Sequence, residues 1–187
     1  MTDREIRKAA KQSILNGKTK QETFEELKGK NYKSAKKTAN IIQKIPSLRA
    51  RSRYKIQYIA LIVLLSIVVL VKMKTVLPFI IENEMWILVI FLLPIIINIF
   101  VGIARYRQNS YITVTLLSYF WQLILGVELV NNTFKPLLLI DIAIAAGLIE
   151  LSSTLNSKLF PEYLTAKEPY KNKHGQNRQR IVIKFED

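Results

Sequence analysis

The stretch MWILVIFLLPIIINIFVGIA, residues 85–104, decides the fold class, because its 20 positions hold no charged residue. A helix that rises about 1.5 Å per residue needs roughly 20 mostly apolar residues to cross about 30 Å of hydrocarbon. One apolar block precedes this stretch and two follow it. The sequence therefore predicts an all-α, polytopic membrane protein with four transmembrane helices in a bundle. The predicted spans are residues 54–74, 85–104, 111–130 and 136–155.

The first 50 residues are predicted to form a small cytoplasmic module of three helices. Ile6, Ala10 and Ile14 recur at four-residue intervals, which places them on one side of a first helix. Thr19 followed by Glu22 matches a capping box and predicts the start of a second helix. A third helical pattern ends before Pro46 and leads toward the first span.

The last 32 residues, 156–187, are predicted to form a mostly flexible cytoplasmic tail. Pro161 and Pro169 prevent a long helix, and the composition is polar. Residues 180–185, Arg-Ile-Val-Ile-Lys-Phe, have strand propensity, but no other segment is an evident partner. This strand is therefore expected to join a partner's sheet, to pair with a second copy, or to remain disordered.

Positive charge is concentrated on one predicted side of the membrane. Residues 1–55 hold 16 Lys or Arg against 5 Asp or Glu, whereas the predicted outer turns hold only Lys72, Lys74 and Lys135. Basic segments tend to stay in the cytoplasm, and no cleavable signal pattern begins the chain. We therefore expect a multi-pass protein of a bacterial inner membrane, with both the N-terminus and the C-terminus in the cytoplasm.

The composition argues against several kinds of chemistry. The chain has no cysteine, and its single histidine, His174, lies in the polar tail, so no metal site or cofactor is expected. The predicted spans contain no serine and histidine pair and no two aspartates arranged as in an intramembrane protease. We therefore expect a protein that is not an enzyme.

Polar and small side chains recur at three- or four-residue intervals in the last three predicted spans, so each helix has one polar face. Asn98 and Glu150 both lie about 20 Å from the outer ends of their spans, and Ser118 reaches nearly the same level. We therefore predict an intramembrane polar cluster of these three residues. Gln122 extends it outward by one turn, and Arg105 approaches it from the inner interface.

Glu150 is the residue of this cluster with the clearest alternatives. A carboxylate in a low-dielectric medium either pairs with a cation or becomes protonated, and proton-coupled transport uses such a group. The other interpretation is a hydrogen-bonded glutamate that joins helices. Glu128 and Asp141 lie nearer the outer ends of their spans, where Lys135 is within reach, and are interpreted as anchoring residues.

A second set of candidate residues is mostly basic and lies along the third N-terminal helix and directly before the first span. Each Lys or Arg near an anionic leaflet contributes about 1 kcal/mol of attraction, which favours contact with anionic phospholipid head groups. The three-helix outline also resembles a helix-turn-helix domain, so contact with nucleic acid is the alternative. The candidates are Lys33, Lys36, Lys37, Asn40, Lys44, Arg49, Arg51, Arg53 and Lys55.

Three functions follow from these features. The first is a non-enzymatic scaffold, regulator or accessory subunit at the cytoplasmic face, working in a homo-oligomer or with a protein partner. The second is a small oligomeric channel, transporter or membrane-perturbing effector that uses Glu150. The third is a membrane-tethered regulator that binds nucleic acid.

Overall fold

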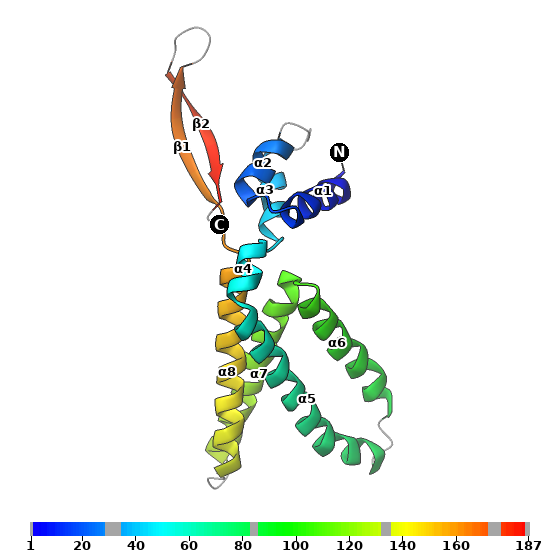
Figure 1. Cartoon of the computed structure of the whole chain (residues 1–187). Helices are drawn as coiled ribbons and strands as arrows, with labels where there is room; N and C mark the ends of the chain where they lie inside the picture. The colour runs from blue at the N-terminus through cyan, green and yellow to red at the C-terminus, as the bar shows by residue number, and fades with distance from the viewer. Residues whose placement is uncertain (1, 29–34, 83–85, 132–135, 172–176, 186–187) are drawn as a thin grey trace. The chain divides into compact units, whose positions relative to one another are not determined.

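The computed structural model describes residues 2–28, 35–82, 86–131, 136–171 and 177–185. These residues form eight helices and one two-stranded sheet (Figure 1). The chain divides into two compact units. We call Met1–Arg53 with Ser157–Asp187 the terminal unit, and Tyr54–Asn156 the spanning unit.

Four helices of the terminal unit come from the N-terminal part of the chain. They are α1 (Asp3–Leu15), α2 (Lys20–Lys28), α3 (Ala35–Gln43) and α4 (Leu48–Arg53). Ile6, Ala10 and Ile14, the residues with helical spacing in α1, are all buried, and Phe24 of α2 and Ile42 of α3 belong to the same core. The short α4 is an addition to the predicted three-helix pattern.

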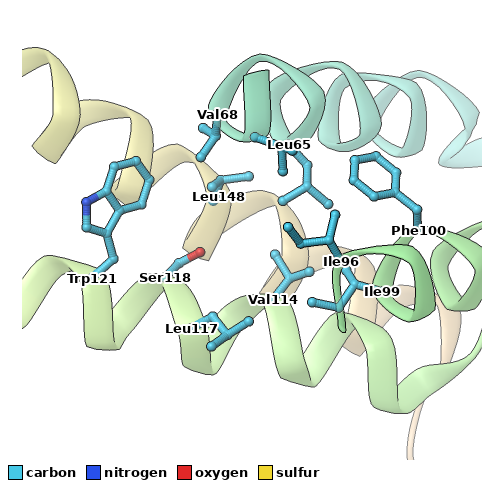
Figure 2. A pocket seen from close by; sticks show the side chains of 11 residues that line it. Leu65, Val68, Ile96, Ile99, Phe100, Val114, Leu117, Ser118, Trp121 and Leu148 are labelled. Carbon is cyan, nitrogen blue, oxygen red and sulfur yellow. The ribbon is translucent and has the colours of Figure 1, made fainter. Parts of the chain in front are cut away.

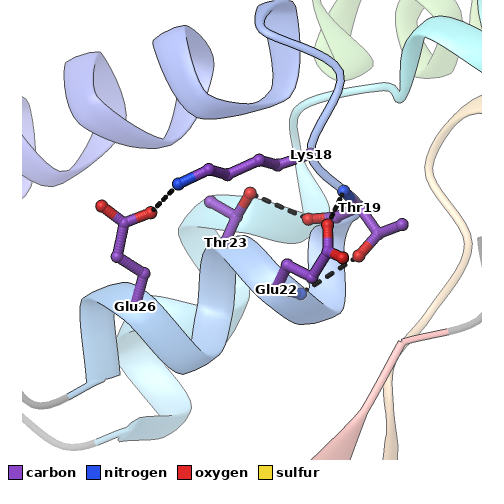
Figure 3. Close-up of polar contacts among 5 residues, drawn as sticks. All are labelled: Lys18, Thr19, Glu22, Thr23 and Glu26. Carbon is purple, nitrogen blue, oxygen red and sulfur yellow. Dashed lines mark hydrogen bonds and ion pairs between the residues drawn. The ribbon is translucent and has the colours of Figure 1, made fainter.

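Hydrogen bonds fix the start of α2, and the capping box expected at Thr19 and Glu22 is present (Figure 3). The Thr19 backbone N–H donates to the Glu22 carboxylate at 2.9 Å, and the Glu22 N–H donates to the Thr19 hydroxyl at 3.1 Å. The hydrogen bond from the Thr19 backbone has the largest effect on the pKa of Glu22 and lowers it, and the Thr19 hydroxyl lowers it further. Lys18 pairs with Glu26 at 2.8 Å, which raises the pKa of Lys18. The ionised forms of these side chains therefore favour the folded helix start.

The C-terminal tail differs from the prediction of a mostly flexible segment. Strand β1 (Leu164–Lys171) pairs antiparallel with β2 (Asn177–Lys184), in a register that sets Leu164 opposite Lys184. The expectation that residues 180–185 have no partner within the chain is wrong. The sequence of β1, LTAKEPYK, did not predict a strand, because apolar and polar residues alternate only weakly in it and it contains Pro169. Each strand of a two-stranded sheet has an open edge, where a missing proline N–H is tolerated.

The end of β2 packs on the N-terminal helices, so both ends of the chain build the terminal unit. Ile183 belongs to the core, and the Phe185 ring lies 5.8 Å from the Phe24 ring, centroid to centroid. The Gln21 side chain accepts from the Phe185 N–H at 3.0 Å and donates to the Ile183 carbonyl at 3.4 Å. Tyr163, just before β1, donates to Asn40 of α3 at 2.6 Å.

The spanning unit consists of α5 (Lys55–Glu82), α6 (Trp86–Ala104), α7 (Gln108–Asn131) and most of α8 (Pro136–Leu159). Among the described residues, three helical segments are long and apolar enough to cross a membrane. They are Lys55–Lys74, Gln108–Val127 and Leu138–Leu159, whereas Ile90–Ala104 of α6 is a shorter apolar segment. The helix α5 continues beyond residue 74, the predicted end of the first span, as far as Glu82.

The turn between α6 and α7 is tight and brings these two helices together. Arg107 donates its backbone N–H to the Gly102 carbonyl at 2.8 Å, and Tyr106 has a positive φ of 51°. This backbone conformation is strained for a residue with a side chain. The Tyr106 ring stacks on Tyr58 of α5, with the centroids 5.0 Å apart, and this contact holds the turn against α5.

Candidate functional site

A charged cluster joins three helices of the spanning unit. The Lys72 ammonium of α5 lies 2.8 Å from an Asp141 carboxylate oxygen of α8. The same nitrogen lies 5.0 Å from the ring centroid of Trp121 of α7. An ammonium at this distance from the face of an indole is attracted by the ring quadrupole. One lysine therefore contacts both of the other helices.

The dielectric constant around this cluster determines how strongly Lys72 and Asp141 attract each other. The Lys72 and Asp141 side chains are 40% and 29% exposed at the surface of the unit. Each residue lies inside a segment that is long and apolar enough to cross a membrane. Attraction between opposite charges grows as the dielectric constant falls, and so does the cost of leaving either charge alone.

An apolar hollow of about 170 Å³ lies between the helices beside the charged cluster. Trp121 lies at one end of it and Phe100 at the other (Figure 2). Ser118 is its one hydroxyl-bearing residue. Helices α5 to α8 all contribute to the wall, whose residues are Leu65, Val68, Val69, Ile96, Ile99, Phe100, Val114, Leu117, Ser118, Trp121 and Leu148.

The residues of the predicted polar cluster occupy different environments. Ser118 is buried and lines the hollow, and Gln122 is half-buried one turn away. Asn98, Arg105 and Glu150 are exposed at the surface of the unit. Helical phase therefore identified Ser118 as an interior residue, and the five-residue cluster stays a prediction.

Two polar contacts of the spanning unit were not predicted from the sequence. The Thr115 hydroxyl of α7 lies 2.7 Å from the Ser152 hydroxyl of α8 and joins these helices. Lys72 pairs with Asp141, although 69 positions separate them in the sequence. The sequence suggested Lys135 as a neighbour of Asp141, but Lys135 lies outside the described residues. Only the opposite charges could have suggested the actual pair, since many arrangements of four helices are compatible with the hydropathy pattern.

The basic candidates lie mostly at the surface. Lys37 pairs with Asp3 at 2.9 Å, and Asn40 accepts the hydrogen bond from Tyr163, so these two side chains make contacts within the terminal unit. Arg51 is half-buried, and Lys33 lies outside the described residues. The other candidates are exposed, namely Lys36, Lys44, Arg49 and Arg53 of the terminal unit and Lys55 of the spanning unit.

The remaining observations concern metal sites and relatives. Within the described parts of the chain, no group of three or more His, Cys, Asp or Glu side chains is placed to hold a metal ion. Comparisons with models of known protein families, with curated proteins and with solved structures found no match.

Proposed function

We propose that the chain is a non-enzymatic, four-span protein of a bacterial inner membrane that acts as a scaffold or regulator at the cytoplasmic face. The observation that carries this proposal is the shared core of the terminal unit, in which Ile183 packs with Phe24 and Gln21 bonds the end of β2. One basic folded unit, built from both chain ends, is then the part available to partners.

The shared core supports an even number of membrane crossings. If both chain ends fold together, they lie on the same side of the membrane, and a chain with three crossings would separate them. Three segments meet the length and hydropathy requirement for a span, and α6 is the remaining long helix. Its 19 residues have no charge. Four crossings, with α6 as the second, therefore fit the fold best.

The distribution of charge supports a cytoplasmic, lipid-facing terminal unit. This unit has 22 Lys or Arg and 9 Asp or Glu, a net charge of +13 out of +14 for the chain. The positive-inside tendency favours the cytoplasm for such a segment. Anionic head groups attract basic residues without requiring a particular geometry. Recognition of nucleic acid requires free side chains on one helix, and Lys37 and Asn40 are engaged within the unit.

Labelling of single cysteines will test the four crossings, and the cysteine-free chain gives no background. Glu82 at the end of α5 and Asn109 at the start of α7 are both exposed, and α6 lies between them. We expect a membrane-impermeant maleimide to label Glu82→Cys in intact cells, and Asn109→Cys only after permeabilisation. Gln12→Cys in α1 is the cytoplasmic control. Labelling of positions 82 and 109 from the same side would contradict a crossing by α6.

Lipid contact by the terminal unit will test the proposed role at the membrane surface. With the full chain in vesicles and a dye on Asn16→Cys, we expect energy transfer to labelled lipids to rise with anionic phospholipid. We expect about 0.5 M salt to reverse the rise, since it screens exposed charges. A variant with glutamine at all of Lys36, Lys44, Arg49 and Arg53 should lose most of this rise in energy transfer. Each basic residue near an anionic membrane surface contributes about 1 kcal/mol of attraction.

The chain offers a matched control for this experiment on another helix. Arg4, Arg7, Lys8 and Lys11 of α1 are also exposed, and their replacement by glutamine removes the same charge. This control variant should keep most of the response to anionic lipid. Equal losses in both variants would mean that net charge alone is responsible, and no response in the unmodified protein would contradict the lipid-facing role.

A further inference from the structure

The apolar hollow and the charged cluster of the spanning unit form one continuous site. Val68 and Val69 of α5 line the hollow, and Lys72 follows them by one helical turn. Trp121 is shared, because it lines the hollow and its ring also lies 5.0 Å from the Lys72 ammonium. The site therefore consists of an apolar hollow with a cation, Lys72, and an anion, Asp141, beside it.

The charges occupy the level of the lipid head groups if the chain has the four crossings proposed above, on which this step rests. Lys72 is two residues from the end of the span segment of α5, and Asp141 is three residues from the start of that of α8. Tryptophan is typical of this level in membrane proteins. The hollow then extends from the head-group level toward the hydrocarbon.

We propose that this site binds a zwitterionic phospholipid with a primary ammonium head group, that is, a phosphatidylethanolamine. An ammonium has three N–H donors, and among the described residues the hydrogen bond to Asp141 uses one of those of Lys72, which leaves donors for a phosphate. The second carboxylate oxygen of Asp141 can accept from the lipid ammonium. The Lys72 and Asp141 pair is thus complementary to a head group that carries both charges.

Complementarity distinguishes this lipid from other phospholipids. A head group with phosphate alone would bring a second anion to Lys72 and would offer no ammonium to Asp141. The trimethylammonium of phosphatidylcholine carries no N–H and cannot donate a hydrogen bond to the carboxylate. The aromatic face that would otherwise attract such a cation is the Trp121 ring, over which Lys72 already lies.

The hollow has the size and polarity for part of one acyl chain. Its 170 Å³ is similar to the roughly 150 Å³ apolar cavity that accommodates a benzene-sized molecule. Its wall offers the Ser118 hydroxyl and otherwise mostly carbon. Within a bilayer, acyl chains are the molecules that surround these helices, and an empty hollow would forfeit dispersion contacts with its lining.

The test measures thermal unfolding of the detergent-purified full chain with one added lipid of a single acyl composition. At a tenfold excess over Kd, we expect phosphatidylethanolamine to raise Tm by about 4 °C. Phosphatidylcholine and phosphatidylglycerol should each raise it by less than half of that. Equal shifts with the three lipids would overturn the proposal, since they would indicate ordinary surrounding lipid.

Three variants separate the head-group contacts from the hollow. Lys72→Gln with Asp141→Asn keeps similar shapes and should make the three lipids equivalent. Ser118→Leu fills the hollow without changing a charge and should abolish the response to all of them. Lys74→Gln, two residues from Lys72, removes an exposed cation outside the site and should change nothing. Loss of the preference in Lys74→Gln, or its persistence in either of the other variants, would overturn the proposal.

A second copy of the chain could fill the hollow instead of a lipid. Light scattering would then show that the purified particle has the mass of a dimer, and the thermal unfolding assay would show no preference among the lipids. That combination also overturns the proposal. The lipid measurement is made in detergent and does not depend on sidedness. Failure here is therefore distinct from failure of the four-span topology, which the cysteine labelling reports.

Discussion

Replacement of Gly102 by alanine is expected to destabilise the spanning unit by about 2–3 kcal/mol, because the added methyl group would overpack the contact between α6 and α7. A Cβ at position 102 would lie 1.7 Å from the Ser110 hydroxyl oxygen and 2.8 Å from the Ser110 Cβ. Rotation of the Ser110 side chain can move the oxygen but not the Cβ. The two helices would have to separate near the tight turn that Tyr106 and its contact with Tyr58 hold in place.

The measurement is reversible unfolding of the purified protein in mixed micelles of increasing SDS content. Gly126 provides the matched control, because it also lies in a spanning helix and a Cβ there would meet no heavy atom within 4 Å. Gly126→Ala should therefore be neutral or slightly stabilising, as alanine has the higher helix propensity. Gly102→Ala with Ser110→Gly should recover most of the loss. Equal effects of Gly102→Ala and Gly126→Ala would contradict the close approach of the helices.

The close approach at Gly102 illustrates which parts of the fold the sequence could predict. Hydropathy and helical spacing are local properties, so they identified the long apolar helices and the buried face of α1. The capping box at Thr19 is local as well. A glycine on a helix face was visible in the sequence, whereas its neighbour Ser110 depends on how α6 turns into α7.

The hairpin shows a different limit. Residues 180–185 had the strand propensity that β2 displays, but β1 contains Pro169 and several charges and has a weak signal of its own. A strand is stable only when it pairs with another strand, and the sequence of β1 did not indicate that it is the partner of β2. The docking of Phe185 against Phe24 joins residues from opposite ends of the chain. No spacing rule relates such residues.

The candidate site was predictable only in part. Helical phase placed Ser118 toward the interior, and the structure buries it in the wall of the hollow. The same reasoning gave Asn98 and Glu150 inward faces, but both are exposed at the surface of the unit. Phase defines one side of a helix, and the arrangement of the other helices decides whether anything covers that side. The pair of Lys72 and Asp141 depends on this arrangement entirely.

The other large effect is expected at the Lys72 and Asp141 pair. Lys72→Met would leave the carboxylate without its cation, and Asp141→Leu would leave the ammonium above Trp121 without its anion. Both side chains are only partly exposed, so an unpaired charge keeps part of its desolvation cost without its partner, and each single variant should lose about 1 to 1.5 kcal/mol. The double variant has no charge to leave unpaired. It should be nearly as stable as the unmodified protein.

A double-mutant cycle in the same SDS unfolding assay measures this coupling, with an expected interaction free energy of about 1–3 kcal/mol. Lys74→Met is the control for loss of a nearby exposed cation, and it should change stability by less than about 0.5 kcal/mol. Additive losses from Lys72→Met and Asp141→Leu would mean that the two charges do not interact. A strong coupling would show that the pair connects α5 to α8, because an ion pair fully exposed to water contributes only a few tenths of a kcal/mol.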